Sequence, residues 1–283
     1  MSLNLKEEFI KTANLKLAAL ISDNREDPPV IALHGWLDNA ASFTPLAKFL
    51  SGIRLIAIDF PGHGKSEHRT GANAYHFVDY AADIILAADA LGLGQFSLLG
   101  HSLGAGVAAM IAATVPERIE RLAMIEGFMP VTAPPEKISV QLRRHITGTS
   151  KSASAPKIYA TIEEAAVSRK RAGDLSSYSA SLIVTRNIVE TPKGYIWRTD
   201  RCLTMPSPVY LTEDHVRTYL SKIECDSLLI QSNNGILKQW PDFAGRESYL
   251  PTARTIEIEG GHHCHMDNPE SVVKHLSPFL HRA

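Results

Sequence analysis

One stretch constrains the fold of this chain more than any other, the run Gly100-His101-Ser102-Leu103-Gly104. The apolar residues 96–99 before it predict a buried strand, and the alanine-rich residues 103–115 after it predict a buried helix. A strand that turns so abruptly into a helix needs a positive φ at the serine and glycines two residues away on either side. The pattern therefore predicts a nucleophile elbow, with His101 packed beneath it. The alternative is a glycine-rich turn with an incidental serine.

Short apolar runs recur along the chain and alternate with helical patterns. They predict strands at residues 15–21, 30–33, 54–58, 96–99, 122–125, 228–230 and 255–258, and helices at 77–91, 103–115 and from 269 onward. Apolar strands that alternate with helices are typical of βαβ units, in which helices cover both faces of a parallel sheet. The sequence therefore predicts the α/β class, with a mostly parallel central sheet.

The alternation of strands and helices breaks after residue 127. Residues 128–221 are polar, contain the Ser/Ala-rich stretch 148–156, and show a helical pattern near 163–171. A long insertion between two strands of a sheet predicts a cap over residues 128–221, and 148–156 predicts a mobile loop. The core is then formed by residues 1–127 and 222–283.

Charge and cysteine content narrow the class of protein. A net charge of −1 argues against a nucleic acid or an anionic membrane as partner. No apolar run approaches the roughly 18 residues of a membrane span, and the first ten residues lack the apolar region of a signal peptide. Three cysteines at unrelated spacings (Cys202, Cys225, Cys264) fit a reducing compartment. We expect a cytoplasmic protein, either a monomer or a small homo-oligomer.

Two further motifs follow predicted strands. His34-Gly35-Trp36 comes directly after residues 30–33, so the backbone N–H groups of Trp36 and Leu103 are the expected oxyanion donors. Residues 59–66 (Asp-Phe-Pro-Gly-His-Gly-Lys-Ser) follow the next strand. We interpret them as a structural loop whose Asp59 and Ser66 brace backbone groups. A catalytic role for His63 is the alternative.

The C-terminal run Gly261-His262-His263-Cys264-His265 is expected to supply the general base. Histidine and cysteine are also metal ligands, so a metal site is an alternative interpretation. Against it, the ligands would crowd into one turn, and no Cys-x-x-Cys motif accompanies them. We therefore predict no metal.

Taken in order, these motifs resemble the α/β-hydrolase fold over nearly the full chain. More narrowly, residues 34–40 (His-Gly-Trp-Leu-Asp-Asn-Ala) and the His262-x-x-His265-Met266 segment resemble the serine-hydrolase-like proteins. The resemblance implies that His262 is the catalytic histidine and that His265 is a structural companion.

The triad acid is where the pattern departs from most of that family. Members usually carry an aspartate after the strand at 228–230, whereas residues 231–237 here contain no carboxylate. Haloalkane dehalogenases instead place a glutamate after the strand that follows the elbow helix, and Glu126 lies there. They also have a glycine-containing turn at the other position, similar to residues 234–237. We therefore predict Glu126 as the acid, with Asn234 or an unseen group as the alternative.

These residues predict a serine hydrolase that needs no cofactor. Its expected substrate is a small molecule with an ester, thioester or related acyl bond, because a serine nucleophile favours attack on a carbonyl carbon. The alternatives are a carbon–carbon bond hydrolase or lyase with the same triad, and a catalytically silent ligand-binding or interaction protein. By their place in the motifs, the residues expected to line the pocket are His34, Gly35, Phe128 and Met129. Trp197 and Trp240 are further candidates.

Overall fold

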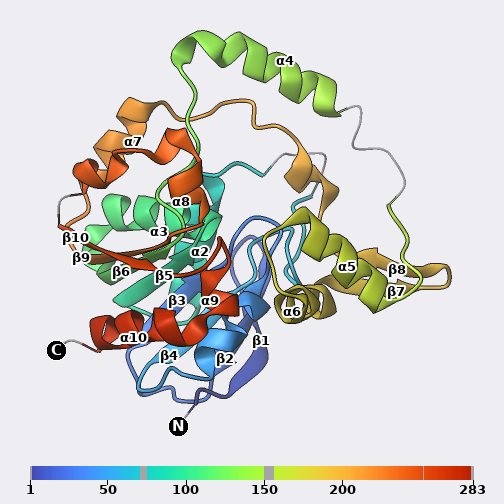
Figure 1. The fold of residues 1–283 in the computed structure, drawn as a ribbon, viewed down its shortest axis with the longest axis horizontal. Helices are drawn as coiled ribbons and strands as arrows, with labels where there is room; N and C mark the ends of the chain where they lie inside the picture. Colours follow the sequence, from blue (N-terminus) through green and yellow to red (C-terminus); the bar gives the residue numbers. More distant parts are fainter. Residues whose placement is uncertain (1, 71–74, 150–155, 251, 282–283) are drawn as a thin grey trace.

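The computed structural model describes residues 2–70, 75–149, 156–250 and 252–281 (Figure 1). Its main sheet has eight strands in the order β1-β2-β4-β3-β5-β6-β9-β10. The strands β4 to β10 of this order are parallel, and β1 and β2 pair antiparallel at one edge. The prediction of a mostly parallel sheet is therefore confirmed. The strand bounds are β1 Leu5–Lys11, β2 Lys16–Ser22, β3 Pro29–Leu33, β4 Arg54–Ile58, β5 Phe96–His101, β6 Ile119–Ile125, β9 Asp226–Ser232 and β10 Ala253–Ile258.

Helices cover both faces of this sheet (Figure 1). On one face lie α2 (Asp79–Ala90), α3 (Leu103–Thr114) and α7 (Glu213–Leu220), and on the other lie α1 (Thr44–Ala47), α9 (Cys264–Asp267) and α10 (Pro269–Leu280). Alternate side chains of β3 enter the two cores: Ile31 and Leu33 enter the first, and Val30 and Ala32 the second. Burial on both faces explains why the strands read as continuous apolar runs.

The N-terminal strand β1 was not predicted. It pairs only with β2 at the sheet edge, and within it Ile10 alone is fully buried. Its charged residues Lys6, Glu7 and Glu8 are accessible to solvent, so the segment lacks the apolar run that marks the inner strands. The inner strand β4, by contrast, has the predicted bounds 54–58.

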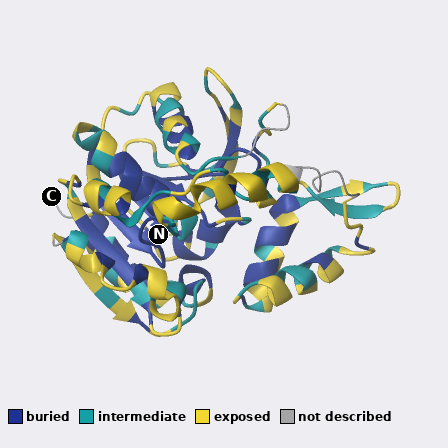
Figure 2. Cartoon of the chain, turned by 90° about the horizontal axis from the view of Figure 1, so that it is seen from above, coloured by how far each residue is buried: buried dark blue, intermediate teal, exposed yellow. Residues whose placement is uncertain are grey.

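The elements between β6 and β9 pack in two different places, some beside the sheet and one on the core (Figures 1 and 2). The helices α5 (Ile162–Ala172) and α6 (Ser177–Asn187) pack with the hairpin β7 (Ile188–Thr191) and β8 (Gly194–Trp197) around a small core of their own beside the sheet. The helix α4 (Ile138–Thr149) precedes them. The later helix α7 instead buries Val216 and Leu220 in the core over α3. Of the stretch 148–156 predicted as a mobile loop, residues 150–155 lie outside the described residues.

A buried ion pair ties the inserted segment to the core. Arg186 of α6 lies 2.9 Å from the Asp59 carboxylate, which is fully buried after β4. Asp59 also accepts hydrogen bonds from the backbone N–H groups of Ala40 and Lys65. The prediction that Asp59 braces backbone groups is therefore confirmed. Among the described residues, no helix is long and apolar enough to cross a membrane.

Candidate active site

The turn between β5 and α3 has the geometry that the glycine pattern predicts. Ser102 has φ of 52° and ψ of −115°, a conformation that is costly for a residue with a side chain. A Cβ at Gly104 would overlap the carbonyl oxygen of Leu33, and one at Gly100 would overlap the backbone of Ala105. The glycines are therefore required for the helix to pass close to the strands. Leu103 opens α3, so its N–H has no acceptor within the helix.

Gly104→Ala is accordingly expected to lower the free energy of unfolding by about 2–3 kcal/mol, since backbone must move to admit the methyl group. The matched control is Gly94→Ala, because a Cβ at Gly94 meets nothing within 4 Å. Urea denaturation of the two variants measures the difference, and equal midpoints would contradict this account of the turn.

Ser102, His262 and Glu126 come together at the carboxyl ends of the parallel strands. The Nε2 of His262 lies 3.0 Å from the Ser102 hydroxyl oxygen, and its Nδ1 lies 3.5 Å from Oε2 of Glu126. The second distance is at the long end of a hydrogen bond, which is common in sites without substrate. The order hydroxyl, imidazole, carboxylate is the arrangement that activates a serine.

Glu126 is fully buried, and its other oxygen, Oε1, accepts a hydrogen bond of 2.7 Å from the Ser232 N–H. A Cβ at Gly235 would overlap this carboxylate, so the glycine in the turn after β9 leaves the space that Glu126 fills. Asn234, the alternative to Glu126, is exposed to solvent. Burial, with the nearby Glu126 charge, raises the pKa of Cys264 to about 12, which makes that thiol an unreactive neighbour.

A cavity of about 850 Å³ opens over Ser102 and is bounded by the inserted segment. Of the predicted site residues, Gly35, Trp36, Ser102, Leu103, Met129 and His262 line it, as do Trp197 and Trp240. Leu37, Ser102, Glu126 and Met129, the non-glycine residues with positive φ in the described chain, all lie at or beside this cavity. Such strain is typical of functional sites. The lining is mostly apolar.

His34 and Phe128, predicted as pocket residues, do not line the cavity. His34 is fully buried under the turn, where its Nε2 accepts a hydrogen bond of 3.0 Å from the Phe60 N–H. Burial lowers the pKa of His34 to about 4, so the ring is neutral. Phe128 packs in the core. His34 follows β3 directly and Phe128 comes three residues after β6, and a position in the sequence does not determine whether a side chain points outward or inward.

The C-terminal histidines and the cysteine have different partners. His262 faces Ser102, His263 bonds to Asp38, and Cys264 is buried near Glu126. The fully buried His265 packs against the His101 ring, with 4.0 Å between the ring centroids. Among the described residues, these four side chains do not form a group that could hold one ion, which argues against the metal site considered for this run.

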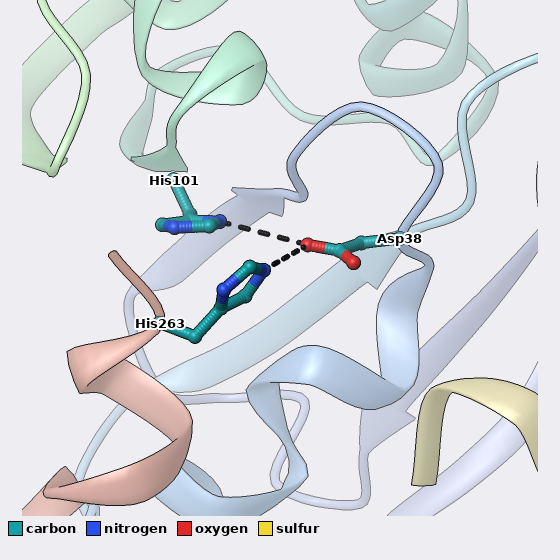
Figure 3. Close-up of side chains that lie close together, drawn as sticks. All are labelled: Asp38, His101 and His263. Carbon is teal, nitrogen blue, oxygen red and sulfur yellow. Dashed lines mark hydrogen bonds and ion pairs between the residues drawn. The ribbon is translucent and has the colours of Figure 1, made fainter. Parts of the chain in front are cut away.

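Another group of side chains has a geometry that metal ligands adopt. Asp38, His101 and His263 are buried, and one ligand atom of each lies within 4.8 Å of the others (Figure 3). Both oxygens of Asp38 already have partners, however. Arg169 of α5 donates to Oδ1 at 2.6 Å, and His263 lies 3.2 Å from Oδ2. A divalent cation would have to displace one of them, so a carboxylate held by Arg169 and His263 describes the group better.

The loop after β4 has a structural role. The Ser66 hydroxyl donates to the Asp59 carbonyl oxygen and accepts from the Ala18 N–H, as predicted. His63 is buried, with Nδ1 facing the Pro61 carbonyl oxygen at 3.1 Å. Burial, together with the neighbouring His34, lowers the pKa of His63 to about 3, and it has no contact with Ser102.

Asp38, Arg169 and Asp174 contact the loops that carry the site, and sequence reasoning missed them. Asp38 lies within the run 34–40 that carries the family resemblance, five residues after β3, and its charge in that run was an available signal. Arg169 and Asp174 come from the inserted segment, and no local pattern indicates which residues of an insertion reach the site.

Known proteins with similar sequences and structures identify the family and the fold of this chain. Residues 28–153 match the alpha/beta hydrolase fold family. A serine hydrolase-like protein of Danio rerio is 33% identical over 267 residues, which cover 89% of this chain and 81% of that protein. The crystal structure of a hypothetical protein from Pseudomonas aeruginosa PAO1 is 39% identical and covers 98% of this chain and 100% of its own, with a TM-score of 0.94. The thioesterase domain of the curacin biosynthetic pathway, at 22% identity, covers 96% of this chain and 98% of its own with a TM-score of 0.85, which shows a common fold.

Proposed function

The chain belongs to the serine hydrolase-like proteins of the α/β-hydrolase fold, and on this basis we propose that it cleaves an ester, a thioester or a related acyl bond through an acyl-enzyme on Ser102. One observation carries the proposal. The Ser102 hydroxyl stands at a strained strand–helix turn with the His262 imidazole 3.0 Å away, which is the geometry of an activated nucleophile.

In the proposed reaction, His262 accepts the Ser102 proton at Nε2 as the hydroxyl oxygen attacks the carbonyl carbon. Glu126 holds the Nδ1–H of His262, which fixes the tautomer and stabilises the imidazolium without taking its proton. His262 then protonates the leaving group. Water, activated in the same way, attacks the acyl-enzyme and releases the acid.

The negative oxygen of the tetrahedral intermediate needs donors on the side of Ser102 away from His262. The backbone N–H groups of Trp36 and Leu103 are proposed for this role, because both residues line the cavity beside Ser102. A Cβ at Gly127 would overlap the Ser102 backbone, so the chain after Glu126 also packs tightly against the turn.

The lining of the cavity favours a substrate with an apolar acyl or alcohol group. Phe77, Met129, Val131, Tyr159 and Trp197 line it, and all of these except Phe77 come from the inserted segment. Apolar groups supply most of the lining surface and favour burial of a hydrocarbon or aromatic group, and polar side chains such as Asn187, Thr199 and Arg201 also reach the cavity. We propose that residues 128–221 act as the cap that shapes this space.

The test is covalent labelling with a fluorophosphonate, read by intact mass and peptide mapping. We expect one adduct per chain on Ser102 and none in Ser102→Ala or His262→Ala. Ser168→Ala is the matched control, because Ser168 lines the same cavity without an imidazole partner, and it should label like the wild type. A folded protein that takes no label would contradict the proposal and favour a ligand-binding role.

A further inference from the structure

Asp38 lies where three loops of the site meet (Figure 3). It comes from the turn after β3, and its carboxylate points between the rings of His101, which precedes Ser102, and His263, which follows His262. Each of these neighbours is thus adjacent in sequence to a residue of the proposed triad. The Asp38 side chain is only 1% exposed.

The strongest contacts of Asp38 are with His263 and Arg169. The Nε2 of His263 lies 3.2 Å from Oδ2 of Asp38, and the Nδ1 of the same ring lies 3.0 Å from the backbone carbonyl oxygen of Asp174. A carboxylate oxygen and a carbonyl oxygen both accept hydrogen bonds, so the His263 ring lies between two acceptors. Burial alone would raise the pKa of Asp38, but His263 and Arg169 hold it well below its usual range.

His101 contacts the network in a different way. Burial and the surrounding histidines hold the pKa of His101 well below its usual range, so its ring is neutral. Its Nε2 donates to the backbone carbonyl oxygen of His262 at 2.9 Å, which leaves Nδ1 without a hydrogen. At 3.8 Å from Asp38, that atom makes no hydrogen bond with the carboxylate. His101 therefore supports the His262 main chain directly.

The inserted segment completes this arrangement from the other side. Arg169 of α5 donates to Oδ1 of Asp38 at 2.6 Å, and Oδ2 of Asp174 accepts from the His262 N–H at 3.2 Å. A Cβ at Gly261 would overlap the Asp174 carboxylate, so this approach depends on glycine there. The main chain of His262 is thus held at its N–H by the insertion and at its carbonyl by the elbow.

The turn that carries the proposed oxyanion donor is also tied to Asp38. The Asp38 N–H donates to the Gly35 carbonyl oxygen at 3.1 Å, closing a turn around Trp36 in which Leu37 has φ of 62°. A change in the position of the Asp38 side chain therefore shifts both this turn and the loop of His262.

We propose that Asp38 is a positioning residue: through His263 and Arg169, its buried carboxylate fixes the Trp36 turn, the His262 loop and the inserted segment relative to one another. The inference rests on the proposed function. It further implies that the proposed triad is correctly aligned only when α5 packs on the core and Arg169 contacts Asp38. Because misplacement of a reacting group by about 1 Å can cost 10²-fold in rate, the effect falls on kcat.

The experiment compares Asp38→Asn and Arg169→Met with the wild type. In Asp38→Asn the amide oxygen can still accept from His263, but the charge that holds Arg169 is lost. We expect kcat on a simple ester to fall by about 10- to 100-fold with KM changed less than about threefold, and labelling of Ser102 to slow by the same factor. Arg169→Lys, which keeps the charge, should recover part of the kcat lost in Arg169→Met.

The matched control is Arg171→Met, an exposed cation of the same helix, which should retain wild-type kcat. Hydrogen exchange gives a readout that does not depend on activity: the backbone amides of residues 34–39 and 260–267 should exchange faster in Asp38→Asn and Arg169→Met. Wild-type kcat and exchange in both variants would overturn the proposal. If the wild type takes no label at Ser102, the proposed function fails, and the exchange rates alone decide whether Asp38 fixes these loops.

Discussion

Glu126→Gln is expected to lower kcat by about 10⁴-fold while the protein remains folded. The Ser232 N–H, which bonds to Oε1, will hold the amide oxygen of the new glutamine and turn its NH₂ group toward His262. An NH₂ donor at Nδ1 forces the imidazole hydrogen onto Nε2, and that tautomer cannot accept the Ser102 proton. Steady-state hydrolysis measures the loss, with circular dichroism and thermal melting to verify the fold.

Two further variants test whether the loss of activity is caused by Glu126 itself. Asn234→Ala alters the other candidate for the acid and should stay within about threefold of the wild type, because the side chain is exposed. Gly235→Ala introduces a methyl group into the space of the Glu126 carboxylate and should impair kcat, whereas Gly94→Ala should not. A Glu126→Gln protein that keeps more than a tenth of wild-type kcat would show that Glu126 is not the acid.

The parts of this fold that could be predicted from the sequence are those in which a local pattern has one physical solution. The elbow is the best example, because glycines at 100 and 104 and a serine between strand and helix fit few other turns. The strand at 54–58 was predicted at its observed bounds because burial on both faces leaves an unbroken apolar run. Edge strand β1 has no such run and was missed.

Side-chain direction and long-range contacts could not be predicted. His34 and Phe128 follow strands as Gly35 and Met129 do, yet they turn into the core rather than the cavity. The bond between Arg169 and Asp38 spans 131 positions of the chain. Contacts of this kind depend on how the insertion folds back over the sheet, which no short window of sequence specifies.

The second large effect expected is loss of stability in mild acid, caused by buried histidines that stay neutral. Burial lowers the pKa of His34 to about 4 and that of His63 to about 3, and it holds those of His101 and His265 well below their usual range. In the unfolded chain each histidine has a pKa of about 6.5. Between pH 6.5 and about 4, the unfolded state therefore binds protons that the folded state does not, and stability falls as the pH falls.

The size of this effect follows from proton linkage. Each histidine that is protonated only when unfolded contributes about 1.4 kcal/mol per pH unit, so four contribute about 5 kcal/mol per unit below pH 6. Asp83 opposes them: burial raises its pKa to about 6, so it adds stability as the pH falls from 6 toward 4, by about 3 kcal/mol at most. The histidine contribution exceeds this. A stability near the lower end of the typical range of about 5–15 kcal/mol would then be exhausted near pH 5.

Urea midpoints measured from pH 7.5 to 4.5 test this expectation, with a steep fall below pH 6.5 as the expected result. His63→Phe removes one titrating group from a site whose neighbours are the Phe60 and Tyr80 rings, so it should flatten the pH dependence and favour the variant most at low pH. The linkage depends only on the number of protons that each state binds. A free energy of unfolding that stays level between pH 7 and 5 would therefore mean that the buried histidines become charged in the folded protein. That result would contradict the neutral packing of His34, His63, His101 and His265.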